Sequence, residues 1–473
     1  MSSPRKLVLA IGGACLAVVV VGTVAVLLVV RANAKGHVQA LASSALGMEV
    51  TVRGKLGMGL FPGPHLSMAD VEIRNGGSEV ATAAQVRLVV ELLPLLHSQV
   101  RTHAIVLNHV RIAIERQHDG HFNFETPPNP SGTGSSTDIQ SVSISDAAVS
   151  FIDERSGNTF AAQSCTVDVR DLKLSSAGGA AAAPSPAYSA TVACGEFRAK
   201  SMVASDLKFS MEKKGGTVDV KPVTMRAFGG HGSGSIRGDL AGATPRFDIH
   251  YELNKFQLAE FFRTMTPREV GVGVLDFAAD LSVRGDTADA MIRTANGKAA
   301  VRGHDLTLQM GDVDERFSRF ESSQNFNLVD VGAFFFAGPL GLVVTKGYNF
   351  ANIFQGSGGS SHVATLVSEW NVEQGVAQAT DVAMATKRNR IALHGGLDFV
   401  NGRFKDVTIA LVDARGCAQV QQKVSGPFDT PQVEQPSVLK SLTGPARRLL
   451  GKAARLLGKQ CDVFYSGSVP QPG

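Results

Sequence analysis

The hydrophobic pattern divides the chain into two parts. Leu7 to Val30 is an apolar run of 24 residues without a charged side chain. About 20 apolar residues suffice for a helix to span a bilayer, so this run predicts one transmembrane helix. From Met48 onward, apolar and polar residues alternate with a period of two, which predicts β-strands.

A cleavable signal peptide is the alternative interpretation of the apolar run. Ala32-Asn33-Ala34 follows it and has the small-x-small form of a cleavage site. The apolar region of a signal peptide spans about 7 to 15 residues, and this run is longer, so we favour an uncleaved anchor. Basic residues precede the run at Arg5 and Lys6 and follow it at Arg31 and Lys35. The positive-inside rule therefore does not fix the orientation by itself.

The alternation repeatedly changes parity inside a strand. Leu66 and Met68 share one parity, and Val71 and Ile73 share the other, with Asp70 at the switch. A bulge or bend produces such a switch. The same step recurs at Asp146, Asp171, Asp206, Asp305, Asp381 and Asp406, and at His109 in a related copy. We interpret these residues as architectural, bonding their own backbone, and not as catalytic carboxylates.

Strands that alternate and bend together predict a mainly β fold. We expect an elongated, curved antiparallel sheet whose apolar face forms a groove, with a few short helices. One helix is expected at 37–46, stopped by Gly47. Another is expected at 256–265, with Leu258, Phe261, Phe262 and Met265 on one face. The Pro/Gly/Ser-rich stretch 126–137 is the best linker candidate, ahead of 175–187 and 355–361.

The C-terminal region predicts a basic amphipathic helix beginning near Pro445. Its polar face carries Arg448, Lys452, Arg455 and Lys459. Such a helix can lie on an anionic membrane, or it can cap the last strands of the sheet. We favour the cap, because a disulfide between Cys417 and Cys461 would tie the helix to the sheet.

Composition agrees with a strand-rich protein and excludes several function classes. The chain has 50 Gly but only one Trp and four Tyr, and its net charge of +4 is small for 473 residues. Nothing therefore indicates nucleic-acid binding. The sequence contains no G-x-S-x-G, H-E-x-x-H, P-loop or C-x-x-C motif, so we expect no enzyme activity, cofactor or metal. His118 and His121 flank an expected turn, and Phe334–Phe336 is expected to pack in a core, with acyl-chain contact as the alternative.

Four cysteines follow the apolar run, and they allow three pairings. A hairpin with the 175–187 loop at its tip places Cys165 opposite Cys194, which leaves Cys417 for Cys461. This pairing requires an oxidising compartment. The alternative is four buried thiols in a reducing cytosol.

Two stretches resemble the AsmA-like family of Gram-negative envelope proteins. The first spans about 5–125, and the second about 365–430. The residues that carry the likeness are Gly54, Phe61-Pro62, Asp70-Val71, Leu92–Leu96, Asp119-Gly120, Asn123-Phe124, Thr386, Arg390–Ala392, Gly395-Gly396 and Leu397-Asp398. The resemblance implies a single-pass inner-membrane protein whose bulk is periplasmic, and a β-groove that binds phospholipid or a similar amphiphile.

The implied function is transport of such lipids toward the outer membrane in support of outer-membrane assembly. The partners are then membrane phospholipid and other envelope proteins. The alternative function is a scaffold or regulator of outer-membrane protein assembly that carries no lipid. The expected organisation is a cytoplasmic tip and anchor (1–35), an N-terminal module (36–125), a linker (126–137), a central β-groove region (138–364) and a C-terminal module with the tail helix (365–473).

Overall fold

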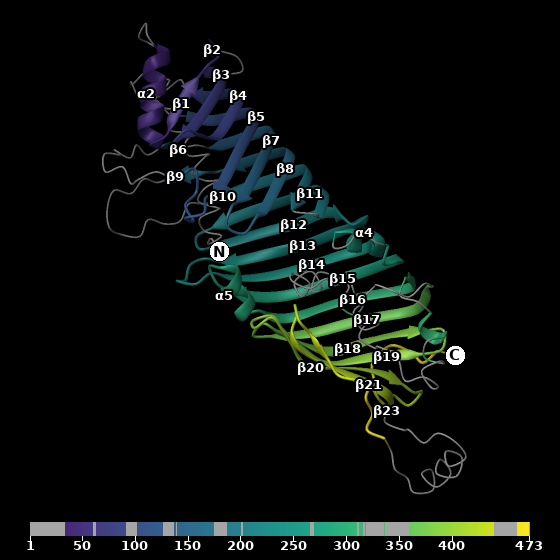
Figure 1. The fold of residues 1–473 in the computed structure, drawn as a ribbon. Coiled ribbons are helices and arrows are strands. Elements are labelled where there is room, and N and C mark those ends of the chain that lie inside the picture. The colour runs from purple at the N-terminus through teal and green to yellow at the C-terminus, as the bar shows by residue number, and fades with distance from the viewer. Residues whose placement is uncertain are drawn as a thin grey trace, which may run out of the picture. The chain divides into compact units, whose positions relative to one another are not determined.

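In the computed structural model, the part of the chain that is described below consists mostly of β-strands (Figure 1). The structure describes residues 34–59, 63–90, 102–125, 137–138, 140–174, 187–199, 202–264, 269–309, 312–315, 317, 335, 359–438 and 461–472. Among these residues, no helix combines the length and the apolar character needed to cross a membrane. The predicted transmembrane helix, Leu7 to Val30, lies outside them.

The chain forms two compact units. Unit 1 comprises residues 1–227, 233–247 and 286–288, and unit 2 comprises residues 228–232, 248–285 and 289–473. Residues on both sides of the 126–137 stretch belong to unit 1. The domain boundaries drawn from the sequence stay a prediction.

Unit 1 opens with a helix and continues as successive strands. Helix α2 (Ala34–Leu46) ends at Gly47, whose φ of 66° stops it as expected. The strands are β1 (Glu49–Val52), β2 (Leu56–Gly59), β3 (His65–Asn75), β4 (Ser78–Val90), β5 (Thr102–Arg116), β6 (Thr137–Asp138), β7 (Ser141–Asp153), β8 (Asn158–Arg170), β9 (Lys173–Leu174), β10 (Tyr188–Ala199), β11 (Met202–Lys214) and β12 (Thr217–Ala227). Strands β13 (Gly230–Asp239) and β14 (Arg246–Gln257) each contain residues of both units.

Among the pairs of neighbouring strands from β1 to β12, pairing is antiparallel with one exception. Strand β3 pairs with β1, β2 and β4, and the order then runs β4, β5, β7, β8, β10, β11, β12. Strands β5 and β7 pair in parallel. A parallel pair requires a crossover connection, so residues 117–140, which include the predicted linker, join two neighbouring strands of one sheet.

Unit 2 follows the same plan with two short helices. Helix α4 (Leu258–Arg263) buries Leu258, Phe261 and Phe262, which confirms the predicted helix in a shorter form. The second is α5 (Ala288–Arg293). The strands are β15 (Gly271–Arg284), β16 (Asn296–Leu308), β17 (Ser361–Glu373), β18 (Val376–Thr386), β19 (Arg390–Asp398), β20 (Arg403–Val412), β21 (Ala418–Pro427), β22 (Gln432–Val433) and β23 (Ser437–Val438). Consecutive strands from β15 to β21 pair antiparallel, and β22 and β23 both pair with β21.

The predicted bends coincide with left-handed backbone. Asp70, His109, Asp146, Asp171, Asp206, Asp305 and Asp406 have φ between 50° and 57°. Asp and His are among the few side chains that adopt this conformation, because their short polar groups bond the local backbone. Asp381 does not have a positive φ, but the predicted bulge is present beside it, because a register shift lies between its pair with Glu369 and the pair of Trp370 with Ala379.

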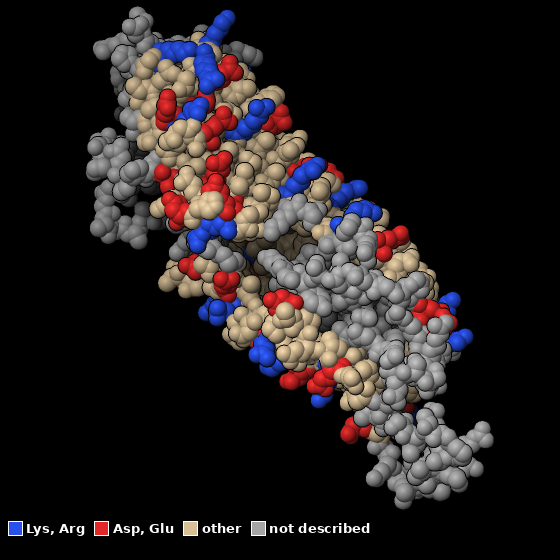
Figure 2. Space-filling model, viewed as in Figure 1, with Lys and Arg blue, Asp and Glu red and all other residues tan. Residues whose placement is uncertain are grey.

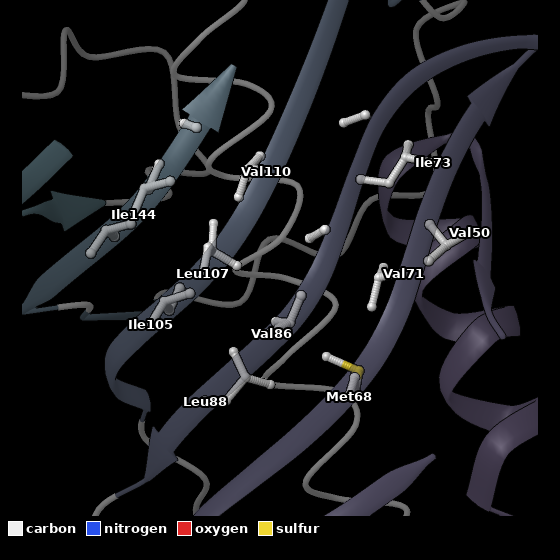
Figure 3. Packing of buried hydrophobic residues seen from close by; sticks show 14 of the residues in the cluster. Val50, Met68, Val71, Ile73, Val86, Leu88, Ile105, Leu107, Val110 and Ile144 are labelled. Atoms are coloured by element: carbon white, nitrogen blue, oxygen red, sulfur yellow. The ribbon is translucent and has the colours of Figure 1, made fainter. Parts of the chain in front are cut away.

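The bend in β3 keeps one face of the strand apolar on both sides of Asp70. Leu66 and Met68 before Asp70, and Val71 and Ile73 after it, are buried in the same cluster. Figure 3 shows their neighbours, such as Leu107 on β5, converging on that cluster from adjacent strands. Burial of each such aliphatic side chain stabilises the fold by roughly 1.5–3 kcal/mol. A left-handed residue therefore corrects the strand phase, so that both halves of a bent strand contribute to one core.

Candidate functional site

The apolar face of unit 1 changes from buried to half-buried at strands β8 to β12. On β3, β4 and β5 its side chains have almost no exposure, as at Leu88 (0 %) and Ile105 (1 %). On β8, β10, β11 and β12 most of the equivalent apolar side chains are half-buried, and Ala190 between them is buried. We call these residues the open apolar face: Val167, Val169, Val192, Phe209, Met211, Val220 and Val223.

The register aligns the open apolar face into rows across the sheet. Val167 lies opposite Val192, which lies opposite Phe209, which lies opposite Val223. The next row joins Val169 through Ala190 and Met211 to Val220. Side chains directly opposite on one face are close enough to contact one another. The rows therefore form a continuous apolar surface and not scattered exposed residues.

The other face of the same strands is polar. Thr191, Lys208, Ser210, Glu212 and Lys221 are all exposed. Ser210 separates Phe209 from Met211 along β11 and lies on the opposite face, because side chains alternate across a strand. A contiguous apolar surface backed by a polar one marks a site for an apolar ligand, a membrane or another protein.

A disulfide and a cation mark the two ends of the open apolar face. Cys165 and Cys194 lie directly opposite each other at disulfide distance, with Cα atoms 4.0 Å apart, and both are buried. The hairpin argument for this pair is confirmed. At the other end, Lys213 Nζ lies 5.9 Å from the centroid of the Tyr188 ring. Burial lowers the pKa of Lys213 and raises the pKa of Tyr188.

Strands β17 to β20 of unit 2 lack such an exposed face. Across one face runs a row of small residues, in which Val367 pairs with Ala383, Ala383 with Ala392, and Ala392 with Ala410. The C-terminal residues 461–472, which we call the tail, cover this row. Tyr465 and Val469 of the tail are buried in one cluster with these small residues.

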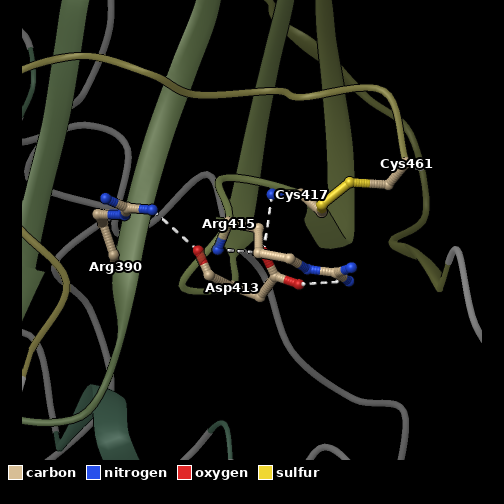
Figure 4. The surroundings of a disulfide bond; sticks show 5 residues. All are labelled: Arg390, Asp413, Arg415, Cys417 and Cys461. Carbon is tan, nitrogen blue, oxygen red and sulfur yellow. Dashed lines mark hydrogen bonds and ion pairs between the residues drawn. A yellow bond between two sulfur atoms is a disulfide. The ribbon is translucent and has the colours of Figure 1, made fainter. Parts of the chain in front are cut away.

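The second cysteine pair fastens the start of the tail. Cys417 and Cys461 lie at disulfide distance with Cα atoms 6.0 Å apart, as expected from the sequence (Figure 4). Next to it, Asp413 accepts bonds from the backbone N–H groups of Arg415 and Cys417, both 2.9 Å. Burial alone would raise the pKa of Asp413, but these bonds and the Arg415 guanidinium hold it below its usual range.

Polar contacts hold the rest of the tail. The Tyr465 hydroxyl donates to Asp381 Oδ1 (2.6 Å), and the Ser468 N–H donates to Asp381 Oδ2 (2.8 Å). Arg390, which is buried, donates to the carbonyls of Val469 (3.1 Å) and Asp413 (2.8 Å). His394 stacks on Phe464 with ring centroids 4.2 Å apart, and burial lowers the pKa of His394. The strand residue Asp381 is therefore an anchor for the tail.

The opposite face of β17 is also covered. Trp370 Nε1 donates to Ser368 Oγ (2.8 Å), and that hydroxyl donates to the Phe335 carbonyl (2.6 Å). Phe335, Val313 and Ser368 are all at most 1 % exposed. Core packing is confirmed for Phe335, the one residue of the Phe334–Phe336 run that the structure describes.

Several predicted residues fall outside the described part of the chain. They are the anchor residues Leu7 and Val30 and the basic tail-helix residues Arg448, Lys452, Arg455 and Lys459. His118 and His121 lie within 2.7 Å of carboxylates, at Glu154 and Glu125 respectively. The described residues contain no group of three or more His, Cys, Asp or Glu arranged to hold a metal ion.

The sequence interpretation predicted an apolar face of the sheet, but it missed which strands leave that face open, and it missed the tail contacts. Alternation identified β11 as a strand, but not which of its neighbours leave it uncovered. A signal for the covered faces was present in runs without alternation, such as 382–385 and 409–412, which are typical of strands buried on both faces. Acidic and basic side chains are mixed on the surface seen in Figure 2.

Comparison with known proteins agrees with the resemblance. Residues 1–185 match the model of the AsmA family, which is associated with the cell envelope. No curated protein matches the chain. The likeness of 365–430 to the C-terminal module of that family stays a prediction.

The residues that carry the N-terminal likeness have structural roles. A Cβ at Gly54 would lie 2.6 Å from the Ala69 Cβ, so only glycine fits beside β3 there. Asn123 is buried, and its side chain donates to the Ala113 carbonyl (2.8 Å) and accepts from the Glu115 N–H (3.0 Å). Phe61-Pro62 and Leu92–Leu96 lie outside the described residues.

Proposed function

Because residues 1–185 of this chain match the AsmA family, we propose that the protein binds phospholipid in the cell envelope through the open apolar face. It then supports lipid transport toward the outer membrane, with the predicted Leu7 to Val30 helix as its inner-membrane anchor. The observation that carries the proposal is the pair of apolar rows on β8, β10, β11 and β12, half-buried and backed by polar side chains.

The mechanism requires no catalytic group. An acyl chain removed from water by these rows gains roughly 25 cal/mol for each Å² of apolar surface buried, while a head group stays hydrated at the edge. Neighbouring apolar side chains bind an acyl chain with similar free energies. The acyl chain can therefore move from one row to the next without being held in a deep energy minimum. The direction of lipid transport would be set by something other than this surface.

The proposed lipid surface is limited to unit 1. The faces of β17 and its neighbours are covered by the tail and by residues such as Val313 and Phe335. We therefore place the lipid on β8, β10, β11 and β12 and not along every strand.

A matched pair of charge substitutions tests the proposal. Phe209→Asp puts a carboxylate on the open apolar face, and Ser210→Asp puts the same group on the polar face of the same strand. The full chain is purified in detergent, its bound lipid is identified by mass spectrometry, and its uptake of fluorescent phospholipid is measured. We expect loss of lipid in Phe209→Asp only, with unchanged circular dichroism in both.

Two results would overturn the proposal. One is a wild-type chain that carries no lipid and takes none up. The other is a folded Phe209→Asp variant that binds lipid as the wild type does. If that variant also supports outer-membrane assembly in cells, the scaffold function replaces lipid transport.

A further inference from the structure

The open apolar face ends in a row of three different side chains. Tyr188 of β10 lies opposite Lys213 of β11, and Lys213 lies opposite Val218 of β12. These three residues, which we call the terminal row, are half-buried and share the face of Phe209 and Met211. Phe247 continues the row, because a Cβ at Gly238 would contact both Val218 (3.8 Å) and the Phe247 ring (3.1 Å).

Lysine and tyrosine at this place combine an apolar stem with a polar tip. The Lys213 ammonium lies over the Tyr188 ring, 5.9 Å from its centroid. Such side chains flank the apolar region of membrane proteins, where their tips meet lipid head groups. Burial that lowers the pKa of Lys213 also strengthens its attraction for an anion, since the surrounding dielectric is lower than in water.

The neighbouring lysine points elsewhere. Lys214 forms an ion pair with Glu212, and both residues are exposed on the polar face. The register thus places the ammonium of Lys213 with the apolar rows and that of Lys214 away from them. This difference supplies a control one residue away.

The face is long enough to hold an acyl chain. Lys213 and Leu207 are six residues apart on β11, which corresponds to about 20 Å of extended strand. One leaflet of a bilayer contributes about half of its ~30 Å hydrocarbon thickness. A chain of about 15 Å that starts at the terminal row therefore ends near Phe209, four residues from Lys213 and within the open apolar face.

We propose that Lys213, supported by Tyr188, binds the phosphate of a phospholipid whose acyl chain lies along the open apolar face toward the Cys165–Cys194 disulfide. This inference rests on the proposed function and adds to it a head-group contact and an orientation. The phosphate lies at the strand ends, where it stays in contact with water.

The test compares a charged and an uncharged lipid with the same labelled chain. Full-length wild type, Lys213→Gln and Lys214→Gln are titrated in detergent with fluorescent phosphatidylglycerol and with fluorescent diacylglycerol. We expect Lys213→Gln to weaken phosphatidylglycerol binding about tenfold, as for loss of one charge-assisted hydrogen bond. Diacylglycerol binding should be unchanged, and Lys214→Gln should match the wild type for both lipids.

Competition with inorganic phosphate separates the two sources of the anion. We expect millimolar phosphate to leave phosphatidylglycerol bound, because the acyl chain contributes most of the affinity. Full displacement by phosphate would overturn the proposal in favour of a free-anion site.

The two proposals fail in distinguishable ways. Equal phosphatidylglycerol affinity in Lys213→Gln and wild type would overturn the head-group contact while leaving lipid binding intact. Absence of binding of either lipid by the wild type would overturn the proposed function itself.

Discussion

Strands β10 to β12 and strands β17 to β20 are both series of antiparallel neighbours, yet they present different surfaces. In the first group one face is half-buried and apolar, and the other is polar and exposed. In the second group the tail covers one face, and on β17 residues such as Phe335 cover the other. The comparison teaches that this fold makes either an available apolar face or a closed core, according to what else packs on the sheet.

The side chains of each group suit its surface. Ala383, Ala392 and Ala410 form a strip of small side chains that is buried in one cluster with Tyr465 and Val469 of the tail. Phe209 and Met211 on β11 have larger side chains, and polar residues alternate with them. The face covered by the tail thus carries small residues, and the open apolar face carries large ones.

The largest expected effect comes from a buried charge in the closed region. Ala392 has no exposed surface, so Ala392→Asp should cost about 4–5 kcal/mol of unfolding free energy, because the carboxylate has no partner there. Phe209→Asp should cost far less, because its position keeps contact with water. Denaturant unfolding followed by the fluorescence of Trp370, the only tryptophan, checks the first, and circular dichroism checks the second. Equal costs would contradict the distinction between the two faces.

A smaller effect is expected from cutting either disulfide. Cys461→Ser and Cys165→Ser open loops of 44 and 29 residues, and each should cost about 3.5–4 kcal/mol through the entropy of the unfolded chain. Only Cys461→Ser should also release the tail, seen as faster hydrogen exchange at the amides of Tyr465 and Val469. Unchanged exchange at these amides would show that the polar contacts alone hold the tail.

Substitution of the left-handed residue at a bend should lower the unfolding free energy equally in both regions. Asp206→Ala and Asp406→Ala each place alanine in left-handed backbone, at φ of 53° and 50°, and should each cost about 1–2 kcal/mol. The matching glycine variants should recover most of that loss, since glycine adopts this conformation without the steric cost. Thermal unfolding of the four variants measures the differences. A cost confined to one region would mean that the bends are not equivalent.

The smallest effect is a pH dependence in the closed region. Burial lowers the pKa of His394 below its unfolded value of 6.5, so the unfolded chain binds the proton first. Stability therefore falls as pH decreases through about 6.5 and levels off below the folded pKa. His250 should act in the opposite direction, because its bond to Asp280 raises its pKa, so that its contribution is lost as pH rises. Trp370-monitored unfolding from pH 5 to 8, in wild type, His394→Gln and His250→Gln, separates the two slopes.

The sequence by itself determined the strands, their bends and the cysteine pairs. Period-two alternation reports which residues share a face, and a parity change at Asp146 or Asp206 reports a residue able to adopt left-handed backbone. Both signals are local. Cys165 and Cys194 were likewise placed opposite each other by a hairpin that is continuous in sequence.

Only the tertiary structure decided which apolar faces are covered. The parallel pairing of β5 with β7 depends on a crossover whose path no local pattern encodes. The tail reaches β18 from more than 80 residues away, through Tyr465 and Asp381. Burial depends on such long-range packing, whereas alternation reports only that one face is apolar. For this reason the open apolar face and its terminal lysine, Lys213, emerged from the fold.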